Sequence, residues 1–489
     1  NQGAYQVDAS RSAIYLPRTK NFPKNTELEA TITLKGTPKG GYIRSVVPSP
    51  DAVTVRQHHS FIELPDDNFE PRMFDPRCGY FSLGYHDYAT PIDEKIMQRL
   101  IYRHRLEKKN PEAAKSEPVE PIVYYLDSGT PEPIRSALLE GASWWNQAFE
   151  AAGYINAFQV RMMPADADPM DVRYNLIQWV HRSTRGWSYG SSVSDPRTGE
   201  IIKGHVSLGS LRVRQDYLIA QGLLNVFKAG SDNDPLVQLA LARLRQLSAH
   251  EVGHTLGLAH NFAASTNDRA SVMDYPHPFV ILQNGEIDFS EAYEVGIGAW
   301  DKRTILYGYQ DFPQQVETTK ALQEILSEND AMGLRYISDQ DARPAHGAHP
   351  HAHLWDNGAS VVEELERMLE VRAHALNQFG LDNIPEGTPL ADLENVLVPL
   401  YLSHRYQAEA VSKLIGGLEY SYAVKGTSDI KTSLVDARVQ RSALAALIRT
   451  LDPDYLTLSE QIIELIPPQP IGYRRDREMF KIRTGLTFD

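Results

Sequence analysis

One short segment constrains the fold of this chain more than any other part of its 489 residues. Residues 249–260 contain the pattern H-E-x-x-H-x-x-G-x-x-H, in which His250 and His254 are four positions apart. On a helix these two side chains lie on the same face, so both imidazoles can reach one metal ion. Gly257 permits a turn that a residue with a Cβ would resist, and this turn returns His260 toward the other two. The segment therefore predicts a helix, a tight turn and three histidines gathered around one ion.

The ligand set also indicates the metal and the kind of site. Three histidines leave the fourth position of a tetrahedral zinc ion to water, which is typical of catalytic rather than structural zinc. Glu251 follows the first ligand and projects beside the ion, where a carboxylate can act as general base. The competing interpretation, a helix with solvated or internally satisfied histidines, leaves the spacing, the glutamate and the glycine unexplained. We predict one catalytic zinc ion held by His250, His254 and His260, with Glu251 as the base.

A second string, Ser271-Val272-Met273-Asp274-Tyr275, lies downstream. With the histidine segment it resembles the active site and Met-turn of the metzincin clan of zinc proteases, and it is most similar to the astacin and serralysin branches. The resemblance implies that Met273 packs beneath the metal without binding it. It also implies that Tyr275 can bind zinc and swing away to stabilise the transition state. The alternative for Tyr275 is a core side chain in a tight turn.

The resemblance implies a zinc metalloendopeptidase that acts on a peptide or protein substrate. Glu251 would accept a proton from the attacking water and return it to the leaving amine, and Tyr275 would donate to the oxyanion. Two alternatives stay open. One is a zinc-containing scaffold or binding protein whose protease domain is occluded, and the other is a peptidase that acts on peptidoglycan cross-links.

The whole sequence predicts an α+β protein of several domains. These are a β-rich N-terminal region (residues 1–115), a metzincin-like protease domain (120–310) and a mostly helical C-terminal region (311–489). In the protease domain we expect strands at residues 121–126, 158–162, 174–180, 187–194 and 201–208, and helices at 132–152 and 235–256. The resemblance implies a twisted five-stranded sheet whose antiparallel edge strand, Trp187–Val193, lines the cleft. An exposed edge strand can pair with a substrate backbone.

The flanking regions carry weaker patterns. Short apolar runs between turn residues predict N-terminal strands at residues 7–16, 27–34, 42–47 and 53–63, followed by a basic helix at 92–109. Apolar residues at helical spacing predict C-terminal helices at 361–379, 393–422 and 433–451.

Charge and hydropathy exclude some classes of partner. The net charge is −14, with 49 basic and 63 acidic residues, which argues against nucleic acid and against an anionic membrane surface. No apolar run is long enough for a transmembrane helix. Strings such as Trp144–Tyr154 resemble a bacterial family of large zinc-dependent metalloproteases of largely unassigned role. From this resemblance we expect an exported protein, periplasmic, outer-membrane-associated or secreted, whose signal is not in this sequence. The oligomeric state stays open.

Two further patterns suggest weaker hypotheses. The tetrapeptide 76–79 around Cys78, Pro-Arg-Cys-Gly, resembles the cysteine switch of matrixin propeptides, in which a thiolate occupies the fourth zinc position. The alternative for Cys78 is a small buried hydrophobic side chain. The cluster His346–His353 is either a second metal site or a loop that binds no metal.

Overall fold

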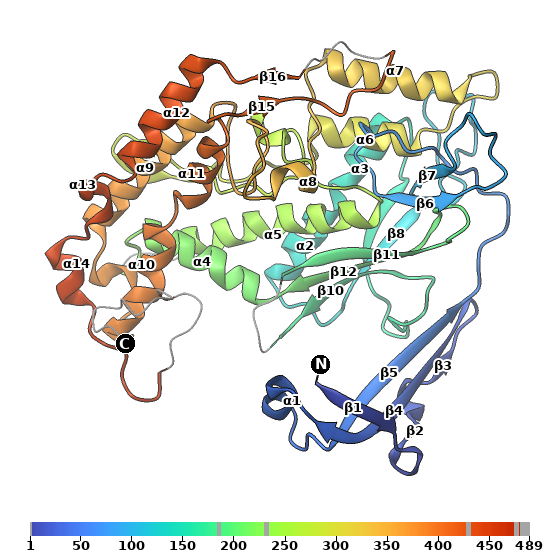
Figure 1. Ribbon diagram of the computed structural model, residues 1–489, viewed down its shortest axis with the longest axis horizontal. Helices are drawn as coiled ribbons and strands as arrows, with labels where there is room; N and C mark the ends of the chain where they lie inside the picture. The colour runs from blue at the N-terminus through green and yellow to red at the C-terminus, as the bar shows by residue number, and fades with distance from the viewer. Residues whose placement is uncertain (1, 183–186, 229–233, 427–431, 474–478, 480–489) are drawn as a thin grey trace.

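The computed structural model describes residues 2–182, 187–228, 234–426, 432–473 and 479 (Figure 1). Over these residues the protein is mixed α/β, with a β-rich N-terminal part and a helical C-terminal part. In Figure 1 the N-terminal sheet projects from the molecule at lower right, and most C-terminal helices form its left side. Between them lies the central sheet with the helix that carries the histidine segment.

The N-terminal sheet is antiparallel and is built around one long strand, β4 (Asn25–Pro38). β4 pairs along most of its length with β5 (Ala52–Ile62). Its other edge pairs in succession with β1 (Gly3–Val7), β2 (Ala13–Ile14) and β3 (Lys20–Asn21). The prediction of a β-rich N-terminal part is confirmed.

The prediction of a strand at residues 42–47 is wrong. These residues form most of helix α1 (Gly41–Val46), which connects β4 to β5 directly after a pair of glycines. An apolar run of this length fits a strand or a helix equally well, and periodicity cannot separate the two.

The prediction of a helix at residues 92–109 is also wrong. This stretch contains strand β7 (Met97–Ile101), which pairs antiparallel with β6 (Ser82–His86). The basic residues that follow β7 do not form a solvated helix face, because Arg103 and His104 are buried against the central part of the protein. Their charge suggested exposure, and the sequence holds no local sign of the partners that bury them.

Five strands form the central sheet in the order β11-β12-β10-β8-β9. The strands are β8 (Ile122–Leu126), β9 (Phe158–Met162), β10 (Asn175–Val180), β11 (Tyr189–Ser194) and β12 (Ile201–Gly209). Four of them run parallel, and β11 pairs antiparallel with β12 at the end of the sheet. No described strand pairs with the outer edge of β11, so this edge strand occupies the position expected from the sequence.

Helices α2 (Ile134–Ser143) and α5 (Asp234–Thr255) pack against each other and against this sheet. The helix expected at residues 132–152 is divided, because α3 (Trp145–Ala151) begins directly after α2. Helix α4 (Leu211–Leu223) precedes α5 and was not expected. Its sequence lacks a single apolar face, since the buried residues of α4 include the polar Asp216 and Gln221 as well as Ala220 and Leu223.

The main hydrophobic core crosses the expected domain boundaries. Beside the central sheet and its helices, it contains Cys78 and Ile101 from the N-terminal region and Leu322 and Leu326 from the C-terminal region. A cut at residue 115 or 310 would divide this core. We therefore propose that the independent N-terminal unit ends after β5 and that the residues following it belong with the main hydrophobic core.

The remainder of the chain is mostly helical, as predicted. α6 follows the Met-turn string and packs against α7, whereas α9 to α14 lie on the side of the molecule where α4 is found (Figure 1). The bounds are β13 (Ile281–Gln283), β14 (Glu286–Asp288), α6 (Ala299–Tyr309), α7 (Thr318–Ala331), α8 (Asp339–Ala342), α9 (Val361–Gln378), α10 (Leu393–Tyr401), α11 (Arg405–Ser412), β15 (Leu418–Glu419), β16 (Ser433–Leu434), α12 (Ala437–Arg449), α13 (Pro453–Leu456) and α14 (Glu460–Leu465). Among the described helices, none has the length and apolar content needed to cross a bilayer.

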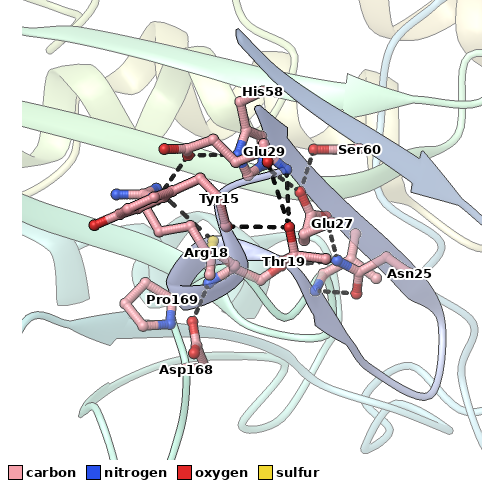
Figure 2. A network of polar contacts seen from close by, with 12 residues as sticks. Tyr15, Arg18, Thr19, Asn25, Glu27, Glu29, His58, Ser60, Asp168 and Pro169 are labelled. Atoms are coloured by element: carbon pink, nitrogen blue, oxygen red, sulfur yellow. Dashed lines mark hydrogen bonds and ion pairs between the residues drawn. The ribbon is translucent and has the colours of Figure 1, made fainter. Parts of the chain in front are cut away.

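A polar network joins the N-terminal sheet to the loop before β10 (Figure 2). Asn25 donates to the carbonyl oxygen of Met170 at 2.9 Å and accepts from the backbone N–H of Val172 at 3.0 Å. Lys20 forms an ion pair with Asp168 in the same loop. These contacts fix the projecting sheet to the central part of the protein.

Two buried glutamates of this network share one histidine. Nε2 of His58 lies 2.6 Å from Glu27, and its Nδ1 lies 3.0 Å from Glu29. Both partners are carboxylates, so the imidazole donates from both nitrogens only when it is protonated. The hydrogen bonds to Glu27 and then Glu29 raise the pKa of His58, against the effect of burial. Arg18 and Arg56 also pair with Glu29.

We expect the pairing of β4 with β5 to weaken as the pH rises, because Glu27 and Glu29 lie on β4 and His58 lies on β5. A raised pKa in the folded state means that the stabilisation by His58 is complete below about pH 6.5 and is lost as the pH passes through the raised value. Thermal unfolding of the wild type between about pH 6 and 9 should show this loss, on the order of 1 kcal/mol for a partly exposed pair. His58→Gln should reduce the dependence on pH in this range by the contribution of His58. An unchanged pH profile in the variant would contradict the assignment.

Candidate metal centre and active site

Helix α5 presents His250 and His254 and ends shortly before Gly257. Gly257 has a φ of 97°, and a Cβ there would lie 2.0 Å from the carbonyl oxygen of Tyr102. Both the backbone conformation and the available space therefore require glycine. The turn brings His260 back to the helix, so that one ring nitrogen from each of the three histidines lies within 4.8 Å of the others.

The two helical histidines are oriented by backbone carbonyl groups. Nδ1 of His250 donates to the oxygen of Val272 at 2.7 Å, and Nδ1 of His254 donates to the oxygen of Leu258 at 2.8 Å. A carbonyl oxygen can only accept, so Nδ1 carries the hydrogen in both rings. Each Nε2 consequently keeps its lone pair for a metal ion.

The third histidine is oriented by a carboxylate. Nδ1 of His260 lies 2.8 Å from Oδ2 of Asp339, which is the first residue of α8. Arg343, one turn later, binds the other oxygen of the same carboxylate. A carboxylate behind a histidine ligand fixes the ring and increases its basicity toward a metal.

The three Nε2 atoms fit a metal ion. Nε2 of His254 and Nε2 of His260 lie 3.1 Å apart, close to the spacing of about 3.3 Å between two ligands of tetrahedral zinc. Since both hydrogens are on Nδ1, these atoms cannot hydrogen bond to each other. Nε2 of His250 is buried without any hydrogen-bond partner, which is unfavourable unless a metal accepts its lone pair. Burial lowers the pKa of His254 to about 3 and that of His250 well below its usual value, so both rings are neutral, as ligands must be.

Glu251 lies beside this group and is 5% exposed. Burial raises the pKa of its carboxyl to about 8, although the charge of Arg243 and a hydrogen bond from the backbone of Gly190 act in the opposite direction. Gly190 is part of β11, so the edge strand touches the carboxylate. A carboxyl whose pKa lies near neutrality is suited to accept a proton and return it.

The Met-turn string lies directly beneath α5. Met273 is fully buried, and its sulfur would be 2.3 Å from a Cβ at Gly253. The turn is held by Asp301 of α6, which accepts hydrogen bonds from the hydroxyl of Ser271 at 2.6 Å and from the N–H of Val272 at 2.8 Å. The turn that Asp301 holds also carries the carbonyl group that orients the first histidine.

Tyr275 lies beside two of the three histidines. Its ring centroid is 5.2 Å from that of His250 and 4.7 Å from that of His260. Its hydroxyl accepts a hydrogen bond from Arg343 at 3.2 Å. Trp355 packs against Tyr275 with ring centroids 5.0 Å apart, and the backbone N–H of Trp355 donates to the carbonyl oxygen of Tyr275 at 2.8 Å. The structure thus brings every predicted site residue together around the histidines.

Sequence reasoning missed the residues that the C-terminal region supplies. Asp339, Arg343 and Trp355 all lie beyond the protease domain expected at 120–310. Asp339 and Arg343 are four positions apart, a spacing that indicates a helical ion pair. Nothing local in the sequence points from this pair to a histidine almost eighty positions earlier.

A pocket of about 710 Å³ opens beside Glu251 and Tyr275. Its walls come from α4, α5 and the residues after the Met-turn, and also from Trp187 before β11 and from the C-terminal helices α10 and α11. Trp187 is 77% exposed. The C-terminal region therefore forms part of the cleft as well as part of the metal site.

The two weaker hypotheses find no support in the described residues. Cys78 is buried in the main core, where burial raises the pKa of its thiol to about 12. Among the described residues, the side chains placed to hold one metal ion are the three histidines, without Cys78. The His346–His353 segment forms no metal-binding group either. Its His349 uses Nε2 to bind the carbonyl oxygen of Tyr420 at 2.9 Å.

Gly253 should tolerate no side chain. A Cβ there would lie 2.3 Å from the sulfur of Met273 and 2.7 Å from the ring of Trp145. We expect Gly253→Ala to lower the free energy of unfolding by about 1–3 kcal/mol, because the tight core must shift to admit a methyl group. Urea unfolding measures the change. Gly41→Ala is the control, since no atom lies within 4 Å of its added Cβ. Equal stability of the two variants would contradict this account.

Comparison with known proteins gives two family matches. The sequence profile of the Met-zincin family matches residues 232–485, which is more than half of the chain and includes α5, the Met-turn and the C-terminal helices. A second profile, that of a domain of unknown function, matches residues 1–109. No curated protein matches the sequence.

Proposed function

Since the chain belongs to the Met-zincin family, which implies a function of the zinc metalloprotease type, we propose that it is a zinc-dependent endopeptidase. The observation that carries this proposal is the orientation of the three histidines. All three turn Nδ1 toward an acceptor and direct Nε2 at one point, next to a buried glutamate.

His250, His254 and His260 would hold the ion. When bound, zinc supplies a Lewis acid that polarises a peptide carbonyl and lowers the pKa of water to about 7. The neutral, pre-oriented rings require no rearrangement to act as ligands. We propose that one ion binds, because the described residues form one metal-binding group.

Glu251 would move the proton. Its carboxylate would take a proton from the attacking water and deliver it to the leaving amine. The pKa of about 8 belongs to the metal-free site, and a zinc ion beside Glu251 would lower it, so that the carboxylate can accept a proton near neutral pH. Tyr275 would donate a hydrogen bond to the oxyanion. The bond from Arg343 to the oxygen of Tyr275 leaves the phenolic hydrogen free for this role.

The substrate would bind along β11. This strand has a free outer edge and touches Glu251 through Gly190, so a peptide paired with it passes the base. A peptide bound in this way can extend beyond the site in both directions, which favours internal cleavage. Export from a bacterial cell stays a prediction from the resemblance.

A cleavage assay tests the proposal. The protein is incubated with a denatured protein library, with and without a zinc chelator, and new termini are identified by mass spectrometry. We expect internal cuts that the chelator abolishes and added zinc restores. The absence of any cleavage would favour the scaffold alternative, whereas cleavage of peptidoglycan cross-links alone would favour the third possibility.

A further inference from the structure

Three arginines line the pocket beside Glu251. Arg243 lies on α5, two turns before the first histidine ligand, Arg212 lies on α4, and Arg405 begins α11. The cationic groups therefore come from three separate helices and converge on one cavity.

Arg243 is the most unusual of the three. It is 2% exposed, its Nη1 donates to the side chain of Gln246, and its Nε has no hydrogen-bond partner. Among the described residues, no carboxylate forms an ion pair with it, whereas Arg212 pairs with Asp216 at 2.9 Å. The negative charges of Asp216 and Glu251 act on Arg243 without forming an ion pair with it. A buried guanidinium without a directly paired carboxylate is costly to fold, and an anion entering the pocket would offset that cost.

Trp355 contacts two of these cations. The guanidinium carbons of Arg212 and Arg243 lie 5.3 and 5.6 Å from the centroid of its indole ring. The electron-rich ring face attracts both groups, but the two like charges repel each other. Burial, followed by the charge of Arg212, lowers the pKa of Arg243. An anion in the pocket that both guanidiniums line would offset this repulsion.

The edge strand indicates which part of the substrate enters the pocket. A peptide paired antiparallel to β11 runs from Ser194 toward Tyr189. It passes Glu251 near Gly190 and then approaches Trp187 and Ser188, which line the pocket. The residues that follow the scissile bond therefore face the arginines.

We propose that this pocket binds a carboxylate on the C-terminal side of the scissile bond. The carboxylate is either the side chain of an aspartate or glutamate or the terminal carboxylate of a short substrate. Guanidinium groups bind carboxylates through paired, charge-assisted hydrogen bonds. This assignment rests on the proposed peptidase function, because it places the carboxylate relative to a scissile bond. The binding of the carboxylate can be measured separately.

A binding measurement tests the pocket without catalysis. Three N-acetylated pentapeptides are titrated calorimetrically into the zinc-loaded Glu251→Gln protein: Ala-Ala-Glu-Ala-Ala amide, Ala-Ala-Gln-Ala-Ala amide and Ala-Ala-Gln-Ala-Ala with a free carboxyl terminus. We expect one or both carboxylate-bearing peptides to bind at least about 10-fold more tightly than the neutral amide, as one charge-assisted hydrogen bond would provide. Tighter binding of the glutamate peptide would indicate a site for an acidic side chain. Tighter binding of the peptide with a free carboxyl terminus would indicate a site for the terminal carboxylate. Equal affinities would overturn the assignment.

Arginine variants test whether the preference for carboxylate-bearing peptides arises in this pocket. Arg212→Gln and Arg405→Gln, each in the Glu251→Gln background, should lose most of the preference. Arg214→Gln should keep the preference, because Arg214 lies on α4 like Arg212 but is exposed and does not line the pocket. Arg243→Gln adds a test at the buried position if the variant folds. A preference that persists in both Arg212→Gln and Arg405→Gln would also overturn the proposal.

The cleavage assay separates this inference from the proposed function. If the wild type cuts peptides without enrichment of acidic residues or chain ends after the cut, the peptidase function stands and the pocket assignment fails. If nothing is cut but the carboxylate-bearing peptides still bind preferentially, the pocket stands and the peptidase function fails.

Discussion

Replacing Glu251 with glutamine should reduce peptide cleavage by about 100- to 10,000-fold, the contribution expected of a general base. Glutamine has the shape of glutamate but cannot take a proton from water. The zinc content should not change, because the three histidines are oriented by Val272, Leu258 and Asp339 rather than by Glu251. Steady-state cleavage of a peptide found in the library assay, together with elemental analysis, measures both quantities.

The fold should also withstand this substitution. The pKa of about 8 means that the metal-free protein carries a mainly neutral carboxyl at pH 7, so a neutral amide adds no buried charge. Glu286→Gln is the matched control, since Glu286 is exposed on β14 away from the cleft. Its activity should equal that of the wild type. Cleavage at the wild-type rate by Glu251→Gln would refute the proposed role of the base.

The parts of the fold that the sequence predicted are those determined by local patterns. The strands of the central sheet are short apolar runs bounded by turn residues, and β9 matches its expected range of 158–162. The grouping of the three histidines was predictable for the same reason, because the helix and the turn at Gly257 set their spacing within one segment. Met273 and Tyr275 followed from a second short string by resemblance.

The parts that the sequence did not predict depend on contacts between distant segments. Arg103 and His104 resemble residues of an exposed basic helix but are buried, because His104 reaches the backbone of Thr255 and the hydroxyl of Tyr124. Asp339 resembles an ordinary acidic residue in the first turn of a helix. Its contact with His260 forms only when the C-terminal region packs over the main hydrophobic core. No local pattern in the sequence indicates that packing.

Asp339→Asn should weaken zinc binding by about 10- to 100-fold, the usual effect of removing a carboxylate behind a histidine ligand. The substitution removes the negative charge that makes His260 a stronger ligand and that holds the hydrogen on Nδ1. It also weakens the contact with Arg343, which donates to Tyr275. Competition with a chromogenic chelator measures the zinc affinity directly, so the result does not depend on catalytic activity.

Asp341→Asn provides the matched control for this prediction. Asp341 lies on the same short helix, α8, but its carboxylate accepts hydrogen bonds from Tyr420 and Tyr422 rather than from a histidine. If Asp339 acts through His260, only the Asp339 variant should lose zinc affinity, although both substitutions perturb α8. Equal losses would mean that loosening of α8 alone accounts for the effect, and the carboxylate would have no specific role. A selective loss would show that the C-terminal region completes the metal site.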